Sequence, residues 1–191
     1  MKPLFFLIFL SFCLTLSACI KVELQPIKPP NSEPVLDISR ESVGLGDVTG
    51  KILYFRLYNN GIAEFDDLDR NSAAKNVNGG SIKTEDIMVR KLVQVDKKDF
   101  QDYINLISSS DFADLEEKYP SKDSCLDAFQ HYDITVNLPE VKKHISLPGY
   151  CGDLSQLYDG SGSTADLPEQ LFELAQKIES DRRRPNARPR K

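Results

Sequence analysis

The chain has 191 residues, 40% of them hydrophobic, which suits one domain with tails and excludes wholesale disorder. The formal net charge of −5 is unevenly distributed: residues 1–18 carry +1, residues 182–191 carry +6, and residues 19–181 carry −12. A nucleic-acid binder would present positive charge on a folded face. An acidic body with a basic tail therefore excludes a general nucleic-acid binder.

The N-terminus has the pattern of a secretory signal peptide. Lys2 is followed by an apolar run from Leu4 to Leu16, and the small residues Ser17-Ala18 precede Cys19. The run is shorter than the about 20 apolar residues that span a bilayer. We therefore expect residues 1–18 to be removed on export. The alternative is an uncleaved signal anchor.

The sequence Leu16-Ser17-Ala18-Cys19 resembles the lipobox of bacterial lipoproteins. The resemblance implies that the mature chain begins at Cys19, which carries a thioether-linked diacylglycerol and fatty acyl chains such as palmitate. Two or more acyl chains anchor a protein stably in a membrane. In such lipoproteins an Asp after the cysteine favours inner-membrane retention. Ile20 stands there, so the resemblance favours the outer membrane of a bacterial cell envelope.

Two cysteines remain for a disulfide. Cys13 lies in the signal peptide and Cys19 is expected to carry lipid, which leaves Cys125 and Cys151 in an export compartment that permits disulfides. The chain-entropy model gives such a bond about 3–4 kcal/mol of stabilisation. The alternative is two unpaired thiols.

Residues 19–34 are expected to form the lipidated cysteine and a tether. Four of them are prolines, which favour an extended chain reaching about 40 Å at about 3.1 Å per residue. A single domain is predicted over residues 35–181.

The first half of this domain is predicted to be strands. Residues 35–40 form a strand, residues 44–50 a loop, and residues 51–58 a strand with Leu53, Phe55 and Leu57 on one face. Residues 62–66 follow after Asn59-Asn60-Gly61, which suits a three-residue hairpin loop. Pairing across this loop places Phe55 opposite Phe65 and Arg56 opposite Glu64.

Further elements follow. Residues 87–95 read as a strand, and Asp96 as the N-cap of a helix from Lys97 to about Ile107. Its apolar stripe is Phe100, Tyr103, Ile104 and Ile107. A short helical turn is predicted around Phe112, Leu115 and Tyr119.

Two alternating segments, 132–136 and 141–147, predict a second hairpin. Pairing Val136 with Val141 places Cys125 and Cys151 at the feet of its two arms. A last helix is predicted over residues 167–179, and residues 182–191 are expected to be a basic disordered tail. The buried stripe of that helix is Leu167, Leu171, Leu174, Ala175 and Ile178.

This order predicts an α+β fold: a mostly antiparallel sheet, built from two hairpins plus additional strands, with two helices packed on one face. With its early hairpin at Asn60-Gly61, its helix and Phe112…Leu115…Tyr119 segment, its second hairpin and its closing helix, the body resembles small, uncharacterised bacterial envelope proteins. That resemblance implies a fold and no activity.

Both histidines lie in the second hairpin. In the pairing above, His144 faces Asp133, and His131 is their diagonal neighbour on the same sheet face. Two imidazoles and a carboxylate are ligands that Zn²⁺ or Cu²⁺ accept, so these three residues are the metal-site candidates. The alternative is a solvated sheet face with an ordinary Asp–His pair.

We find no sequence motif of a nucleophile elbow, phosphate loop or zinc protease, and we expect no enzyme and no cofactor. The sequence predicts a lipid-anchored, non-catalytic binding or structural module of the cell envelope, with an envelope protein or peptidoglycan as partner. A further alternative is a cell-wall tether. Arg190-Lys191 resembles the end of the cell-wall-linked major outer-membrane lipoprotein, whose terminal lysine is joined to peptidoglycan.

Overall fold

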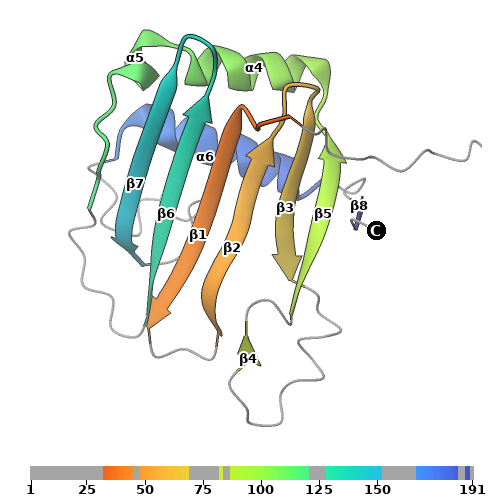
Figure 1. Cartoon of the computed structure of the whole chain (residues 1–191), viewed down its shortest axis with the longest axis vertical. Coiled ribbons are helices and arrows are strands. Elements are labelled where there is room, and N and C mark those ends of the chain that lie inside the picture. The colour runs from red at the N-terminus through yellow and green to blue at the C-terminus, as the bar shows by residue number, and fades with distance from the viewer. Residues whose placement is uncertain are drawn as a thin grey trace, which may run out of the picture.

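The computed structural model describes residues 32–44, 48–68, 82–83, 87–120, 128–151, 167–184 and 188–189. The predicted signal peptide, Cys19, Cys125 and most of the tether lie outside these residues. Figure 1 shows an antiparallel sheet with the two longer helices on one face, which confirms the α+β class. Among the described residues, no helix is long and apolar enough to cross a bilayer.

The strands are β1 (Leu36–Gly44), β2 (Val48–Leu57), β3 (Ile62–Leu68), β4 (Ile82–Lys83), β5 (Met88–Gln94), β6 (Ala128–Asn137), β7 (Lys142–Tyr150) and β8 (Arg188–Pro189). The helices are α4 (Lys97–Ile107), α5 (Ser110–Ala113) and α6 (Glu169–Arg182). The predicted loop over residues 44–50 is wrong at both ends, because Gly44 ends β1 and residues 48–50 open β2.

The sheet order is β7-β6-β1-β2-β3-β5-β8, with β4 added beside β2. The first strand therefore lies between the two hairpins, pairing with β2 on one side and β6 on the other. Both long edges are partly covered: residues 117–119 bond to Ser146 of β7, and β8 pairs with β5. Short covering segments of this kind reduce edge-to-edge association.

The β2–β3 hairpin has the predicted register. Arg56 pairs with Glu64 and Leu57 with Ala63. Gly61 has a φ of +76°, the left-handed conformation that such a loop requires and that glycine adopts without steric cost. Its N–H donates to the carbonyl of Tyr58, and the Tyr58 N–H donates to that of Ile62.

A β-bulge at Tyr54 changes which face Leu53 occupies. Ile38 pairs with Phe55 while the next residue, Ser39, pairs with Leu53, so Tyr54 is the extra residue of β2. Phe55 and Leu57 lie in the core as predicted, but Leu53 lies on the opposite face, beside Ser39. The prediction that Leu53 shares their face is wrong because the bulge interrupts the period of two.

The β6–β7 register differs from the prediction by two residues. Val136 pairs with Lys143 instead of Val141, because the turn is tighter than expected and the Leu138 N–H donates to the carbonyl of Val141. Leu138 is buried, which holds it in the hairpin. Since side chains alternate with a period of two, this shift leaves the side chains of residues 132–136 and 143–147 on their predicted faces.

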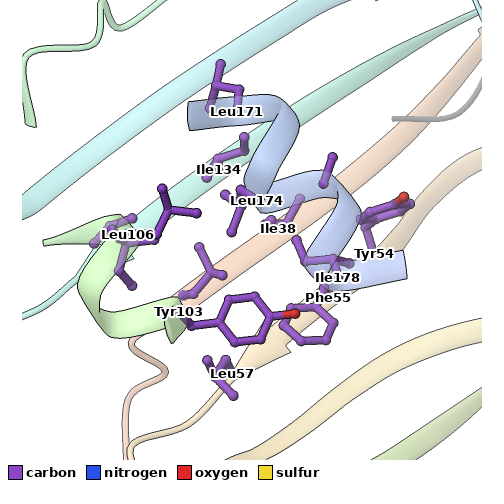
Figure 2. Close-up of a cluster of buried hydrophobic side chains, with 14 of the residues drawn as sticks. Ile38, Tyr54, Phe55, Leu57, Tyr103, Leu106, Ile134, Leu171, Leu174 and Ile178 are labelled. Atoms are coloured by element: carbon purple, nitrogen blue, oxygen red, sulfur yellow. The ribbon is translucent and has the colours of Figure 1, made fainter. Parts of the chain in front are cut away.

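The core lies between the sheet and the helices α4 and α6 (Figure 2). All five residues of the predicted α6 stripe are buried, as are Tyr103 and Ile107 of α4, while Phe100 and Ile104 are partly buried. Tyr103 stacks on Phe55 with ring centroids 5.7 Å apart. The bulged Tyr54 packs edge-on against Tyr132 and donates a 2.7 Å hydrogen bond to Glu179 of α6.

The C-terminal segment corrects the predicted domain boundary. Helix α6 continues to Arg182, whose guanidinium lies 4.3 Å from the ring centre of Tyr54. Arg184 pairs with Asp96, Asp99 and Asp181. The expectation of disorder from residue 182 onward is therefore wrong for Arg182, which ends α6, for Arg184, which binds the start of α4, and for β8, which pairs with the edge of β5.

Asp96 precedes α4 as predicted, but its side chain makes no capping hydrogen bond. It accepts from Arg184 instead, over 2.9 Å. The pairing joins the start of α4 to the end of α6, two points far apart in the sequence.

Candidate functional site

The face of the sheet opposite α4 and α6, here called the outer face, is where polar side chains gather. On β1, Asp37 and Ser39 alternate with the buried Leu36 and Ile38, so the two chemistries separate onto opposite faces. An open groove of about 540 Å³ lies on the outer face. Its lining is Asp37, Ser39, Lys51, Ile52, Leu53, Arg56, Asp66, Arg90, Asp133, Thr135 and His144.

Arg56, in the lining of the groove, pairs with two carboxylates. Its guanidinium lies 2.6 Å from Asp37 on β1 and 3.1 Å from Glu64 on β3. Burial alone would lower the pKa of Arg56, but the bonds and charge of Asp37 more than offset it, so the pKa is raised. Arg56 therefore stays charged at any physiological pH.

Glu64 is buried, with 1% of its surface exposed, and Tyr58 donates a 2.7 Å hydrogen bond to it. Burial, together with this carboxylate, raises the pKa of the Tyr58 hydroxyl. A buried carboxylate of this kind is stable only because it is paired and hydrogen-bonded. The sequence predicted the Arg56–Glu64 pair and missed the tyrosine.

Arg90 on β5 extends this set of ion pairs. It pairs with Asp66 over 2.5 Å, and its guanidinium lies 3.9 Å from Glu64. The second oxygen of Asp66 accepts a 2.7 Å bond from the Leu53 N–H beside the bulge. Asp66 thus satisfies the buried backbone N–H of Leu53.

The structure brings together His131, Asp133 and His144, as the sequence predicted. The Oδ1 atom of Asp133 lies 3.2 Å from Nε2 of His131 and 3.7 Å from Nε2 of His144. The residue opposite Asp133 is Ser146, however, and His144 faces Thr135, because of the register shift. The contacts survive because diagonal neighbours on one sheet face remain within reach of long side chains.

This cluster does not have the geometry of a metal centre. Both imidazoles approach one carboxylate oxygen, and within the described ranges no group of three His, Cys, Asp or Glu side chains is arranged to hold a metal ion. Two imidazoles beside a shared acceptor form a hydrogen-bonded surface cluster. The metal site at these three residues stays a prediction.

The same atoms also exclude a catalytic triad at this position. Ser146 Oγ lies 3.1 Å from Nε2 of His131, the same nitrogen that faces Asp133. In a triad the acid and the nucleophile contact different nitrogens of the histidine ring. The acid orients the imidazole through one nitrogen, and the nucleophile donates its proton to the other. Ser146 is therefore a hydrogen-bonding neighbour in this cluster and not an activated nucleophile.

The cysteines can be placed only in part. Cys151 directly follows β7 and is disulfide-bonded, and its partner lies outside the described residues. The pairing with Cys125 stays a prediction. It is compatible with the sheet, since β6 begins three residues after Cys125 and β7 ends one residue before Cys151.

Sequence reasoning missed Lys51, Asp37, Asp66 and Arg90 as members of one groove. The alternation along each strand does place them on polar positions. The alternation does not give the strand order. Because β1 lies between β2 and β6, Asp133 of β6 and Lys51 of β2 lie near each other on the outer face. No family model matches the chain, and no curated protein matches it in sequence.

Proposed function

We propose that the protein is a membrane-anchored lipoprotein of the bacterial cell envelope whose α+β domain is a non-catalytic binding module. The observation that carries this proposal is Leu16-Ser17-Ala18-Cys19 at the end of an apolar run too short to span a bilayer. Acylation of Cys19 would anchor the domain to the membrane through the predicted tether. The outer membrane is the proposed location, since Ile20 follows the cysteine.

The way the tether enters the domain supports this arrangement. Val35 donates to the carbonyl of Leu57 and accepts from the N–H of Asn137, so the chain enters beside the β2–β3 and β6–β7 turns. These turns lie at the end of the sheet where β1 begins (Figure 1).

The chemistry of the groove supports binding over catalysis. Its two arginines are paired with Asp37, Glu64 and Asp66, and its histidines share one carboxylate oxygen. A groove of this volume falls within the range of about 300–1,000 Å³ typical of ligand sites. We propose that the outer face binds an envelope component.

Acylation of the chain tests the proposal. Cells expressing the full chain are labelled with a palmitate analogue and compared with Cys19→Ser and Cys13→Ser variants. We expect label on the wild type and on Cys13→Ser, whose cysteine lies in the cleaved segment, and none on Cys19→Ser. Equal label on all three variants, or none on the wild type, would contradict the proposal.

The attachment of Lys191 to the cell wall stays a prediction. Part of the C-terminal segment contacts the domain, so a shorter segment would be available to reach the cell wall than the sequence predicts. Arg182 and Arg184 contact the folded domain, and residues 188–189 pair with β5. Deletion of Lys191 is the test. Sacculus-bound protein that disappears with this one residue would support the tether, and sacculus binding that persists would exclude it.

A further inference from the structure

The two edges of the sheet are closed in different ways. At β7, Ser146 exchanges backbone hydrogen bonds with residues 117–119, and the strand contains Pro148, which has no N–H to offer a further strand. At the opposite edge, β8 lies beside β5 (Figure 1) and pairs, within the described residues, with Lys91 and Leu92 alone. The closure of the β5 edge therefore depends on a very short piece of the C-terminal segment.

The backbone of β5 alternates between its two neighbours. The Val95 N–H donates to the carbonyl of Gly61, and the register between β5 and β3 is regular throughout β5. Because the backbone groups of successive residues point to opposite sides of a strand, the odd-numbered residues of β5 bond to β3. The residues whose N–H and C=O groups face the edge are therefore the even-numbered ones: Met88, Arg90, Leu92 and Gln94.

Strand β8 fits this alternation. Leu92 faces Arg188 and Lys91 faces Pro189, so Arg188 is the residue of β8 whose N–H and C=O face β5. The backbone nitrogen of Pro189 faces away from β5, and its missing N–H costs no bond there. On the outer side of β8 the same proline offers no donor to a further strand. The short strand therefore ends the sheet.

The segment that carries β8 is anchored at Arg184, four residues before Arg188. Arg184 pairs with Asp96 and Asp99 at the start of α4 and with Asp181 of α6. An anchor so near in the sequence keeps the local concentration of β8 at the β5 edge high. This favours the pairing of a strand that would be too short to bind by itself.

Without β8, the β5 edge would lack the features that keep strand edges from pairing. It is seven residues long and contains no proline, and its register with β3 has no bulge. Arg90 and Lys91 are charged, but Asp66 and Asp67 of β3 pair with them. Their repulsion from the same residues of a second copy is therefore reduced. An uncovered β5 would be open to another strand.

We propose that β8 is a removable cover and that the β5 edge beneath it is an interface for a second copy of this chain. The two β5 strands would pair antiparallel about a two-fold axis and join the two sheets. In the register centred on Leu92, Arg90 of one copy pairs with Gln94 of the other. Lys91 then faces Val93, so no two like charges lie directly opposite. This inference goes beyond the proposed function and does not depend on the lipid anchor.

The test compares Arg188→Pro with Arg188→Ala in the full chain, solubilised in detergent micelles. Proline removes the N–H that faces Leu92, whereas alanine keeps it and removes the same side chain. At low protein concentration, ¹H–¹⁵N NMR should show the Leu92 amide of Arg188→Pro exchanging its hydrogen at least about tenfold faster than that of the wild type or Arg188→Ala. The Val93 amide bonds to β3 and should be unchanged.

The exchange rates decide whether β8 is a removable cover. An unchanged rate at Leu92 would show that β8 does not cover the edge. Equal acceleration at Leu92 and Val93 would show that the strand unfolds without β8, which also overturns the proposal.

Association is measured by sedimentation velocity in the same micelles over a range of protein concentrations. We expect monomers for the wild type and Arg188→Ala, and for Arg188→Pro a dimer whose share rises with concentration while exchange at Leu92 slows again. A monomeric Arg188→Pro, equal association of the wild type, or a dimer in which Leu92 still exchanges rapidly would overturn the interface.

A second substitution locates the contact. Val89 lies on β5 on the same side as Val93 and is half-buried. A charge pointing inward from an edge strand opposes pairing with another strand. Val89→Lys in the Arg188→Pro chain should therefore restore the monomer, and a dimer that persists would contradict pairing through β5.

Discussion

The hydroxyl of Tyr103 on α4 donates a 2.9 Å hydrogen bond to Asp181 on α6, and both side chains are buried. This bond joins two helices separated by 78 positions in the sequence. Asp181 extends the apolar stripe of α6, three residues after Ile178, and so a carboxylate occupies a core position. The pair is the buried member of the polar contacts between the two helices, which also include Arg184 with Asp96 and Lys177 with Asp102.

Tyr103→Phe should lower the free energy of unfolding by about 1–3 kcal/mol, because a buried carboxylate oxygen loses its donor while the ring packing is kept. The measurement is chemical denaturation followed by circular dichroism. Tyr119→Phe is the control: its hydroxyl accepts from the exposed Glu116 N–H, and we expect a loss below about 1 kcal/mol. Equal losses in the two variants would show that the buried pair has no special role.

Arg184→Ala should destabilise the domain by about 1–3 kcal/mol, since Arg184 joins Asp96 and Asp99 of the α4 start to Asp181. Arg183→Ala is the matched control. The Arg183 side chain is 76% exposed and pairs with Glu179 within α6, so we expect a change within about 0.5 kcal/mol. If removal of Arg184 were as mild, residues beyond 181 would not belong to the folded domain.

Stability should depend on pH through Asp181. Burial raises the pKa of this carboxyl above its ordinary value of 3.8, although Tyr103 and Arg184 act against the increase. A raised pKa in the folded state means that the stabilising contribution is complete below about pH 3.8 and is lost as pH rises through the folded value. Relative to Asp181→Asn, the wild type should lose stability as pH rises above 3.8.

Unfolding of the wild type and of Asp181→Asn, measured at several pH values, checks this dependence. A wild type that gained stability relative to Asp181→Asn over the same pH range would contradict the sign of the shift. That result would mean that the charge of Arg184 outweighs burial.

Gly61→Ala should destabilise the domain by about 1–2 kcal/mol, because alanine disfavours a φ of +76° and its Cβ would lie 3.0 Å from the Gln94 side chain. Thermal unfolding of this variant beside Asn59→Ala, an exposed position in the same loop, provides the comparison. Similar melting temperatures for both variants would indicate a different turn.

The hairpin predictions show what a sequence pattern can and cannot determine. The β2–β3 register was predictable because a shift of one residue would place Phe55 opposite an acidic residue. The β6–β7 register was not, since a shift of two keeps His144 and Asp133 on the same face and only the tight turn at Leu138 decides between them. The bulge at Tyr54 leaves no sequence signal, because Leu53, Tyr54 and Phe55 are all apolar.

The candidate site divides in the same way. The three residues of the histidine cluster were predictable from one local hairpin. The groove combines residues from β1, β2, β3, β5, β6 and β7, and its members meet only through a strand order that no local pattern encodes. The role of Arg184 was missed for a related reason, since a run of arginines resembles a solvated tail until the acidic start of α4 is placed beside it.

The mass of the N-terminal peptide of the mature chain, purified from cell membranes, tests the lipid anchor most directly. We predict a peptide that begins at Cys19 and carries a diacylglycerol together with fatty acyl chains. An unmodified peptide, or a mature chain that begins at any other residue, would contradict the assignment of this protein as an envelope lipoprotein.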